Sequence, residues 1–413
     1  MMCRNKESVK KLDLGQGGDL MKAVVISDIH LGIDDKIAEN VKNRPLLMDF
    51  IERLRKEKKT DEIVINGDFL DQWFLPGTYE HEPDSDIFYR QIAKNNQDVM
   101  EAFQAVIRDG IRLVYVPGNH DMTLSHQTLV SILPGITQAR DVRGLGRYRT
   151  GARGEIVIEH GHRYESFCAP DMFSNKAFME YGEPILPPGY FFARIGVQSI
   201  VEGHPEVHKQ IAELPLPDRE DAYQVIRYAY YKVWKDVVEK IFPVKEDIGD
   251  KFIRVGIDGF QGQFSMKDIV PGAGSDGISQ ELYSDFGKHW EEVQRRNLVP
   301  HPVSLPEQLS RMTDQTLRAE YAKKQYFDLD PTVDVVVFGH THVPFYQEFD
   351  GFDRKKIYVN EGTWVDHNSD DPENTAVFAE IVSDERETRV SLLKCVGDDR
   401  AEDIVPVKNQ YVK

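Results

Sequence analysis

Five apolar runs of the chain are each followed directly by histidine, carboxylate or amide side chains. Residues 22–27, 62–66, 112–117, 155–159 and 333–338 are the runs. The side chains that follow them are, in chain order, Asp28 and His30; Asp68; Asn119, His120 and Asp121; His160 and His162; and His340 and His342. Imidazole nitrogen and carboxylate or amide oxygen are ligands that suit Mn, Fe or Zn ions. The pattern therefore predicts metal chemistry.

The runs are short and rich in β-branched residues, which is typical of buried strands. In an open α/β sheet the carboxyl ends of the strands form the ligand-binding edge. We therefore expect the five groups to meet at one edge although they are far apart in the sequence. Two divalent ions held close together can clamp a phosphoryl group and lower the pKa of a bridging water until hydroxide is available near neutral pH. The ligand mixture predicts a two-metal hydrolase of this kind.

His120 stands apart from the predicted ligands because it follows Asn119 and is itself followed by Asp121. An imidazole near the leaving oxygen can donate a proton, and a carboxylate beside it can orient the ring or support its positive charge. We therefore expect His120 and Asp121 to be the catalytic pair.

The composition narrows the class of protein. The 413 residues are 40% hydrophobic and 29% charged, with a net charge of −18. A nucleic-acid-binding protein normally has a basic face, and the sequence has no Lys/Arg cluster of that kind. No apolar run is long enough for a membrane span, and Met1–Asp19 lacks the apolar segment of a signal peptide. These features favour a cytoplasmic protein with a loose N-terminal extension at 1–20.

The three cysteines are odd in number and far apart, and they form no CxxC pattern. A disulfide framework and a thiolate zinc site are therefore both disfavoured.

Strand and helix patterns alternate in the first part of the chain, which favours an α/β fold with helices on the faces of a sheet. Helices are expected at 44–58, 88–109 and 125–133. The alternation of strand and helix patterns ends at 165. Strand patterns return at 333–338, 356–360, 375–382 and 388–396, and the last three are expected to form an antiparallel run. Between them the pattern predicts helices at 190–202, 218–242, 281–297 and 305–326.

We therefore expect a catalytic domain made of 21–164 and 331–413, and a mainly helical cap at 165–330. The cap is expected to begin and end near the metal edge, because its ends are close in sequence to His160 and His340. Most of its aromatic side chains have helical spacing, which favours core packing over a base-stacking or acyl-chain pocket.

In order, the five groups resemble the five signature blocks of the calcineurin-like metallophosphoesterases. The resemblance implies a four-layer αββα sandwich with a dinuclear metal site at one edge. It implies that one metal is bound by Asp28, His30, Asp68 and His342. The other would be bound by Asp68, Asn119, His160 and His340, so that Asp68 bridges the two ions. Manganese is the first expectation for the metal, with iron and zinc as alternatives.

Ser27–Gly32 and Asn66–Trp73 are similar to a bacterial subgroup that includes UDP-2,3-diacylglucosamine diphosphatases. That subgroup typically has Arg where this chain has His120, and a much shorter cap. The lipid substrate is therefore not carried over.

Three residues near the blocks have open roles. His162 is expected either to support the ligands from behind or to contact substrate. Asp71 and Trp73 are expected either to line the metal edge or to pack in the core.

The leading function is hydrolysis of a small phosphorylated compound, which leaves mono-, di- and pyrophosphatase activity and the oligomeric state open. A Mn-dependent nuclease is the alternative, and a non-catalytic scaffold is less favoured because all eight motif residues are present.

Overall fold

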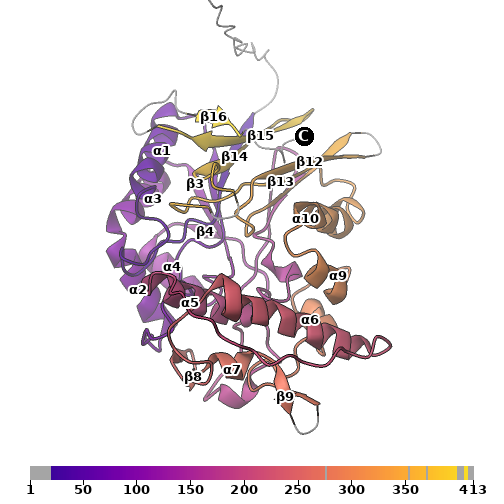
Figure 1. Cartoon of the computed structure of the whole chain (residues 1–413). Helices are drawn as coiled ribbons and strands as arrows, with labels where there is room; N and C mark the ends of the chain where they lie inside the picture. The colour runs from indigo at the N-terminus through magenta and orange to yellow at the C-terminus, as the bar shows by residue number, and fades with distance from the viewer. Residues whose placement is uncertain (1–19, 275–276, 352–353, 369–370, 398–403, 408–413) are drawn as a thin grey trace, which may run out of the picture.

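Two mixed β-sheets lie against one another at the centre of the molecule (Figure 1). The computed structural model describes residues 20–274, 277–351, 354–368, 371–397 and 404–407, so nearly all of the expected N-terminal extension lies outside the described residues. The larger sheet has the order β16-β15-β14-β1-β2-β3-β4, and the smaller sheet has the order β12-β13-β11-β6-β5. The predicted ligand groups follow strands of both sheets.

The strands of the larger sheet are β1 (Met21–Ile26), β2 (Glu62–Asn66), β3 (Arg112–Val116), β4 (Thr137–Gln138), β14 (Val377–Ser383), β15 (Thr388–Cys395) and β16 (Ile404–Pro406). Those of the smaller sheet are β5 (Tyr148–Thr150), β6 (Ile156–Ile158), β11 (Val335–Phe338), β12 (Phe345–Asp350) and β13 (Lys355–Asn360). β1, β2 and β3 are parallel to one another, as are β6, β11 and β13.

The side chains of each strand alternate between two apolar layers, as the period of a strand requires. In β1, Val24 and Ile26 pack with the helices α1 (Arg44–Glu57) and α3 (Gln97–Arg108). Ala23 and Val25 point the other way and pack with the smaller sheet. The two sheets are therefore stacked, and α1 and α3 cover the outer face of the larger one.

A helix from the insertion covers the outer face of the smaller sheet. It is α10 (Gln315–Ala322), which continues as a π-helical turn over Lys323–Phe327. Tyr321 and Tyr326 pack there with Phe338 of β11 and Tyr358 of β13. Figure 1 shows α1 and α3 on one side of the sheets and α10 on the other, so the predicted four-layer αββα sandwich is confirmed.

The predicted helix at 88–109 is two helices, α2 (Ser85–Asn95) and α3. The break lies at Asn96, whose buried side chain donates hydrogen bonds to the carbonyls of Ile92 and Gly32. A short helix, α4 (His126–Ile132), begins after Ser125, which caps it. The prediction failed at 96 because an Asn side chain that binds the backbone competes with the helical hydrogen bonds.

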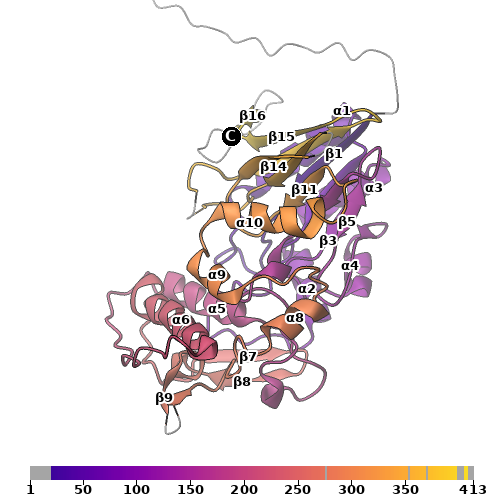
Figure 2. The same ribbon diagram turned by 90° about the vertical axis from the view of Figure 1, so that its right-hand side faces the viewer.

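The insertion holds most of the predicted helices but also strands that were not predicted. Its other helices are α5 (Pro188–Val201), α6 (Ala222–Asp236, continuing as a π-helical turn to Ile241), α7 (Met266–Ile269), α8 (Trp290–Arg296) and α9 (Leu305–Ser310). Single-turn 3-10 helices cover His162–Tyr164 and Lys176–Phe178. Two hairpins lie between α6 and α8 in the sequence. They are β7 (Ile253–Ile257) with β8 (Phe260–Phe264), and β9 (Gly272–Gly274) with β10 (Gly277–Ser279). Figure 2 shows α5, α6 and α9 together beyond one end of the sandwich.

The expectation that both ends of the insertion lie at the metal edge is wrong. β6 and β11 are parallel neighbours, with Ile156 opposite Val335. The insertion therefore leaves from the carboxyl end of β6 and must cross the sheet to reach the amino end of β11. The helix α10 lies on this crossover, so the last part of 165–330 belongs to the sandwich. The predicted antiparallel run of 356–360, 375–382 and 388–396 holds only for its last two members. β14 and β15 are antiparallel in the larger sheet, whereas β13 lies in the smaller sheet, parallel to β11 and antiparallel to β12.

Among the described residues, no helix combines the length and the apolar character that crossing a membrane requires.

Candidate metal centre

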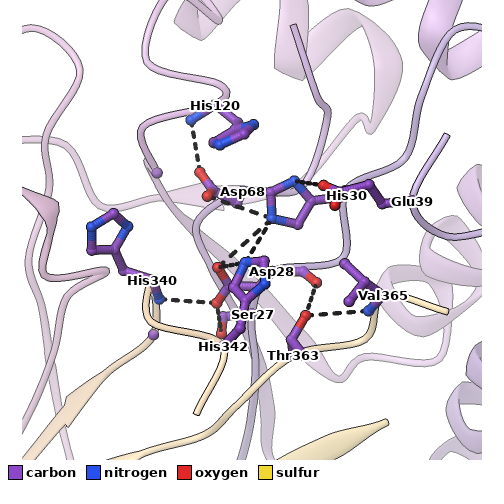
Figure 3. Close-up of polar contacts among 12 residues, drawn as sticks. Ser27, Asp28, His30, Glu39, Asp68, His120, His340, His342, Thr363 and Val365 are labelled. Atoms are coloured by element: carbon purple, nitrogen blue, oxygen red, sulfur yellow. Dashed lines mark hydrogen bonds and ion pairs between the residues drawn. The ribbon is translucent and has the colours of Figure 1, made fainter. Parts of the chain in front are cut away.

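The predicted ligands lie at one edge of the sandwich, where β1, β2 and β3 of the larger sheet and β6 and β11 of the smaller sheet end (Figure 3). Five of them have a left-handed backbone: Asp28 (φ 51°), His30 (φ 50°), Asp68 (φ 49°), His340 (φ 72°) and His342 (φ 58°). Non-glycine residues rarely adopt this conformation, and it is concentrated at functional sites. The backbone therefore turns sharply after β1, β2 and β11, which directs these side chains to one place.

Asp28, His30 and His342 form the first group of ligand atoms, which lie within 4.8 Å of one another. The Nε2 atoms of His30 and His342 are 3.1 Å apart, and His342 Nε2 is 3.1 Å from Asp28 Oδ1. Nδ1 of His30 lies 2.6 Å from Oδ2 of Asp71. This contact places the proton on Nδ1 of a neutral ring and leaves Nε2 as a ligand atom.

Asp68, His160 and His340 form the second group, again within 4.8 Å. His160 donates from Nδ1 to the carbonyl oxygen of Asn66 at 2.7 Å, which leaves Nε2 for a ligand. That Nε2 is 3.2 Å from Oδ2 of Asp68 and 3.2 Å from Oδ1 of Asn119. The amide oxygen of Asn119 is thus beside the second group, as the resemblance implies.

Asp68 lies between the two groups. Its Oδ2 is 3.2 Å from Nε2 of His160 and 3.7 Å from Nε2 of His30. Its Oδ1 accepts a hydrogen bond from the backbone N–H of His120 at 2.8 Å, which fixes the carboxylate (Figure 3). One carboxylate in contact with both groups has the position that a bridging ligand needs.

The donor set fits divalent metal ions. Imidazole nitrogens and carboxylate oxygens lie within 4.8 Å of one another in each group, and such a buried set needs positive charge, supplied either by protonated rings or by a bound cation. The chemistry of these residues supports the fit.

The electrostatics agree. Burial opposes protonation of His160, but the carboxylates of Asp68 and Asp28 outweigh it and raise its pKa to about 10. Burial also opposes protonation of His340, where the carboxylate of Glu165 outweighs it and raises the pKa to about 10. Burial favours the neutral form of Asp68, yet His160 and His120 hold the pKa of Asp68 well below its usual range. The carboxylates therefore favour positive charge at the positions of these histidines, which a bound cation would also supply.

A model of the calcineurin-like phosphoesterase family matches residues 21–344, a span that includes all five groups. The chain belongs to the calcineurin-like phosphoesterases. It is a metal-dependent hydrolase that acts on phosphoester bonds.

Solved structures with likeness to this phosphoesterase include a dimetal phosphatase from Danio rerio, with 14% identity and a TM-score of 0.36, over 90% of this chain and 95% of that one. A predicted phosphoesterase from Streptococcus pneumoniae has 11% identity and a TM-score of 0.29, over 95% of this chain and 99% of that one. No curated protein matches the chain. The family assignment rests on the match of 21–344.

The predicted catalytic pair of this phosphoesterase needs a correction. Asp121 does not contact the ring of His120: its Oδ1 accepts from the backbone N–H of Gly118 at 2.7 Å and its Oδ2 from that of Phe69 at 2.8 Å. The carboxylate on the ring is Asp71, whose Oδ1 is 2.9 Å from Nδ1 of His120. Asp121 points away because its two oxygens satisfy one backbone donor in the turn after β3 and one in the loop after β2.

Asp71 therefore holds two histidines, since its other oxygen contacts Nδ1 of His30. Burial favours its neutral form, but His120 and His30 keep its pKa below its usual range. Trp73 packs against His120 with ring centroids 4.6 Å apart and ring planes tilted by 32°, and only 1% of Trp73 is exposed. Both residues contact the site, and the sequence signal was their place three and five residues after Asp68.

His162 lies behind the ligands and does not line the cavity described below. Its Nε2 is 3.0 Å from the carbonyl oxygen of Gly144, and its ring centroid is 5.3 Å from that of His160. Burial, together with the nearby His160 and His340, lowers its pKa well below the usual value. Gly161, with φ 104°, turns the chain into the 3-10 helix that carries His162 behind His160. Of its two expected roles, this position fits support of His160.

A turn after β13 holds two ligand loops, and its residues were not predicted as part of the site. Asn360 donates from Nδ2 to the carbonyl oxygen of Gly339 at 2.5 Å, beside His340. The hydroxyl of Thr363 donates to the carbonyl oxygen of Asp28 at 3.0 Å (Figure 3). The turn thus fixes the backbone at or beside a predicted ligand from each sheet.

Two glycines allow the ligand loops to approach one another. A Cβ atom on Gly118 would lie 2.1 Å from Oδ1 of Asp68, and one on Gly67 would lie 2.4 Å from Nδ1 of His160. Any larger residue would displace a predicted ligand.

A cavity of about 360 Å³ lies over the metal centre. Residues of both ligand groups line one side, and residues of the insertion, from Glu165 to Met312, line the other. His120 also lines the cavity, so Nε2 is the ring nitrogen that can reach a bound molecule, because Nδ1 is held by Asp71.

Proposed function

We propose that this phosphoesterase hydrolyses a small-molecule phosphate ester or pyrophosphate at a dinuclear metal centre. Asp28, His30, Asp68 and His342 would hold one ion, and Asp68, Asn119, His160 and His340 would hold the other. The observation that carries the proposal is the contact of Asp68 with both groups, 3.2 Å from His160 and 3.7 Å from His30. When bound, two such ions supply a Lewis acid for the phosphoryl oxygens and lower the pKa of coordinated water. Manganese is the first metal to test.

His120 would act as the general acid in this mechanism. The carboxylates of Asp71 and Asp68 raise the pKa of its ring against the opposing effect of burial. A protonated ring on the cavity surface can donate from Nε2 to a leaving oxygen, while Asp71 holds Nδ1. Trp73 would limit the rotation of the ring by packing against it.

We propose that the first and middle parts of the insertion act as a cap that selects substrates. The cap would extend from Glu165 through α9, whereas α10 is a layer of the sandwich. Support comes from the cavity, whose second wall is made by residues of the insertion.

The nuclease alternative is less well supported. No Lys or Arg is among the described residues that line the cavity, so the phosphates of a polynucleotide would meet no basic side chain there. A cytoplasmic location stays a prediction.

The proposal is tested by metal analysis after Mn²⁺ loading, followed by assays with phosphate monoesters, diesters and pyrophosphates beside a supercoiled plasmid. Small-ester turnover that is lost with a chelator and returns with Mn²⁺ supports it. Nicking of the plasmid without small-ester turnover would replace it with the nuclease function.

A further inference from the structure

The wall of the cavity opposite the metal centre is apolar. Part of it is one face of α5, formed by Phe192, Ala193, Gly196 and Ile200. These residues are three to four positions apart along the helix, apart from the adjacent first pair, and so they lie on one face. Other apolar side chains, among them Val233 and Phe242, extend this wall from α6 and the turn after it. The aromatic residues of the insertion are mostly core, as predicted, but Phe192 and Phe242 are partly exposed to the cavity.

Small residues on the cavity face of α5 leave space beside the helix. Glycine weakens a helix interior relative to alanine, yet Gly196 lies in the middle of α5. A Cβ atom there would lie 3.2 Å from the ring of Phe242. Gly196 therefore allows Phe242 to lie against α5 without a side chain between them. The small side chain of Ala193, on the same face of α5, projects little into the cavity.

The apolar wall reaches the surface. Ile200 is 42% exposed and Met312 is 37% exposed, and both line the cavity. An apolar group that starts beside the metals can therefore remain in contact with apolar side chains until it meets solvent.

The charged side chains that line the cavity also favour a substrate with an apolar part. Among the described residues that line it, the charged side chains other than the ligands and His120 are Glu39 and Glu165. Two carboxylates and no Lys or Arg disfavour a second phosphate on the substrate, because like charges repel and nothing pairs with the extra anion.

We propose that the substrate is a phosphoester with a single phosphoryl group and an apolar organic part, alkyl or aromatic, that packs on α5. This inference rests on the proposed function and narrows it to one substrate class. Nucleotides and sugar polyphosphates are outside that class.

The first experiment measures kcat/KM of the Mn²⁺-loaded enzyme on methyl, butyl and hexyl phosphate and on the matching p-nitrophenyl alkyl diesters. Phenyl phosphate separates an aromatic from an alkyl preference, and ATP represents the polyphosphates. Each buried methylene should raise kcat/KM about threefold to fourfold, so butyl phosphate should exceed methyl phosphate by at least about tenfold. Equal values along the series, or a preference for ATP, would overturn the inference.

Two neighbouring residues of α5 provide a matched pair of variants. Ile200 lines the cavity, whereas Val201, 55% exposed, does not. Ile200→Asp should lower the hexyl-to-methyl ratio about tenfold, and Val201→Asp should leave that ratio unchanged. Ala193→Phe, which fills the cavity, should lower the same ratio and gives a second test. A ratio that falls equally in Ile200→Asp and Val201→Asp would contradict a specific wall.

Binding separates this inference from the proposed function. Hexylphosphonate and methylphosphonate cannot be hydrolysed at the C–P bond, and calorimetry compares their affinities for the Mn²⁺-loaded protein. Tighter binding of hexylphosphonate that Ile200→Asp weakens would support the apolar wall even if no ester were hydrolysed, and the proposed function would then be wrong. Ester hydrolysis with equal binding of both phosphonates would leave the function standing and overturn the wall.

Discussion

Nδ1 of His120 lies 2.9 Å from Oδ1 of Asp71. The residue beside His120 in the sequence, Asp121, binds backbone N–H groups instead. The orientation and the raised pKa of the imidazole proposed as the general acid therefore depend on a carboxylate from the loop after β2.

Asp71→Asn should reduce turnover and move the alkaline limb of the pH profile to lower pH. The Asp71 carboxylate favours the protonated ring of His120, so its loss lowers the pKa at which the acid is deprotonated. The measurement is kcat against pH, with metal content determined in parallel because Asp71 also holds His30. Asp121→Asn is the comparison: it should lower the melting temperature and leave the limb in place. A shift of the limb in Asp121→Asn alone would restore the original pairing.

His120→Ala should keep both metal ions and lose about 10² to 10⁴ in kcat on an alkyl phosphate, the usual worth of general acid–base catalysis. A p-nitrophenyl ester, whose leaving group needs little protonation, should lose much less. An equal loss on the two substrates would show that His120 binds substrate or metal rather than donating a proton.

Metal binding should release protons from the centre. His160 and His340 have pKa values of about 10 without bound cations, so both rings are protonated at pH 7 and must lose a proton to become ligands. The sign follows directly: affinity for Mn²⁺ should rise as the pH rises toward 10. Calorimetry in two buffers of different ionisation enthalpy counts the protons, and elemental analysis should find two ions per chain. One ion per chain would contradict the bridging position of Asp68.

Gly118→Ala should reduce the Mn²⁺ content and the turnover. The new Cβ atom would lie 2.1 Å from Oδ1 of Asp68, so the bridging carboxylate has to move. Gly249→Ala is a suitable control because a Cβ atom at Gly249 meets no heavy atom within 4 Å. Unchanged metal content in Gly118→Ala would mean that the Asp68 loop can shift without loss of the site.

Glu361→Gln should stabilise the chelated protein at neutral and alkaline pH. Burial raises the pKa of Glu361 from 4.5 to about 8, although Asn66 donates a hydrogen bond to it. Since the folded pKa exceeds the unfolded one, the stability that Glu361 contributes is complete below pH 4.5 and is lost as the pH rises through 8. Thermal unfolding of both proteins with a chelator should diverge over this range, by at most about 5 kcal/mol. Parallel curves would contradict a neutral Glu361.

The blocks and the strands before them were predictable because each is local in sequence: a β-branched run, then polar ligands. The two-residue period of β1 also places Val24 and Ile26 in one apolar layer and Ala23 and Val25 in the other. The partner of His120 was not predictable, because sequence proximity favoured Asp121, whereas its oxygens accept from Gly118 in the turn after β3 and from Phe69 in the loop after β2. The return of the insertion depends on the parallel pairing of β6 with β11, a long-range contact that no local pattern records.

The positions of the predicted ligands in the sequence set the order in which they are synthesised. Asp28 is made early, His342 late, and the turn with Asn360 and Thr363 that fixes both loops is made later still. β1 is then flanked by β14, which follows that turn. A nascent chain thus contains the first predicted ligands long before the last ones, and the proposed dinuclear centre could form only after the turn has been made. Incomplete or prematurely terminated products of translation would then lack the proposed hydrolytic activity.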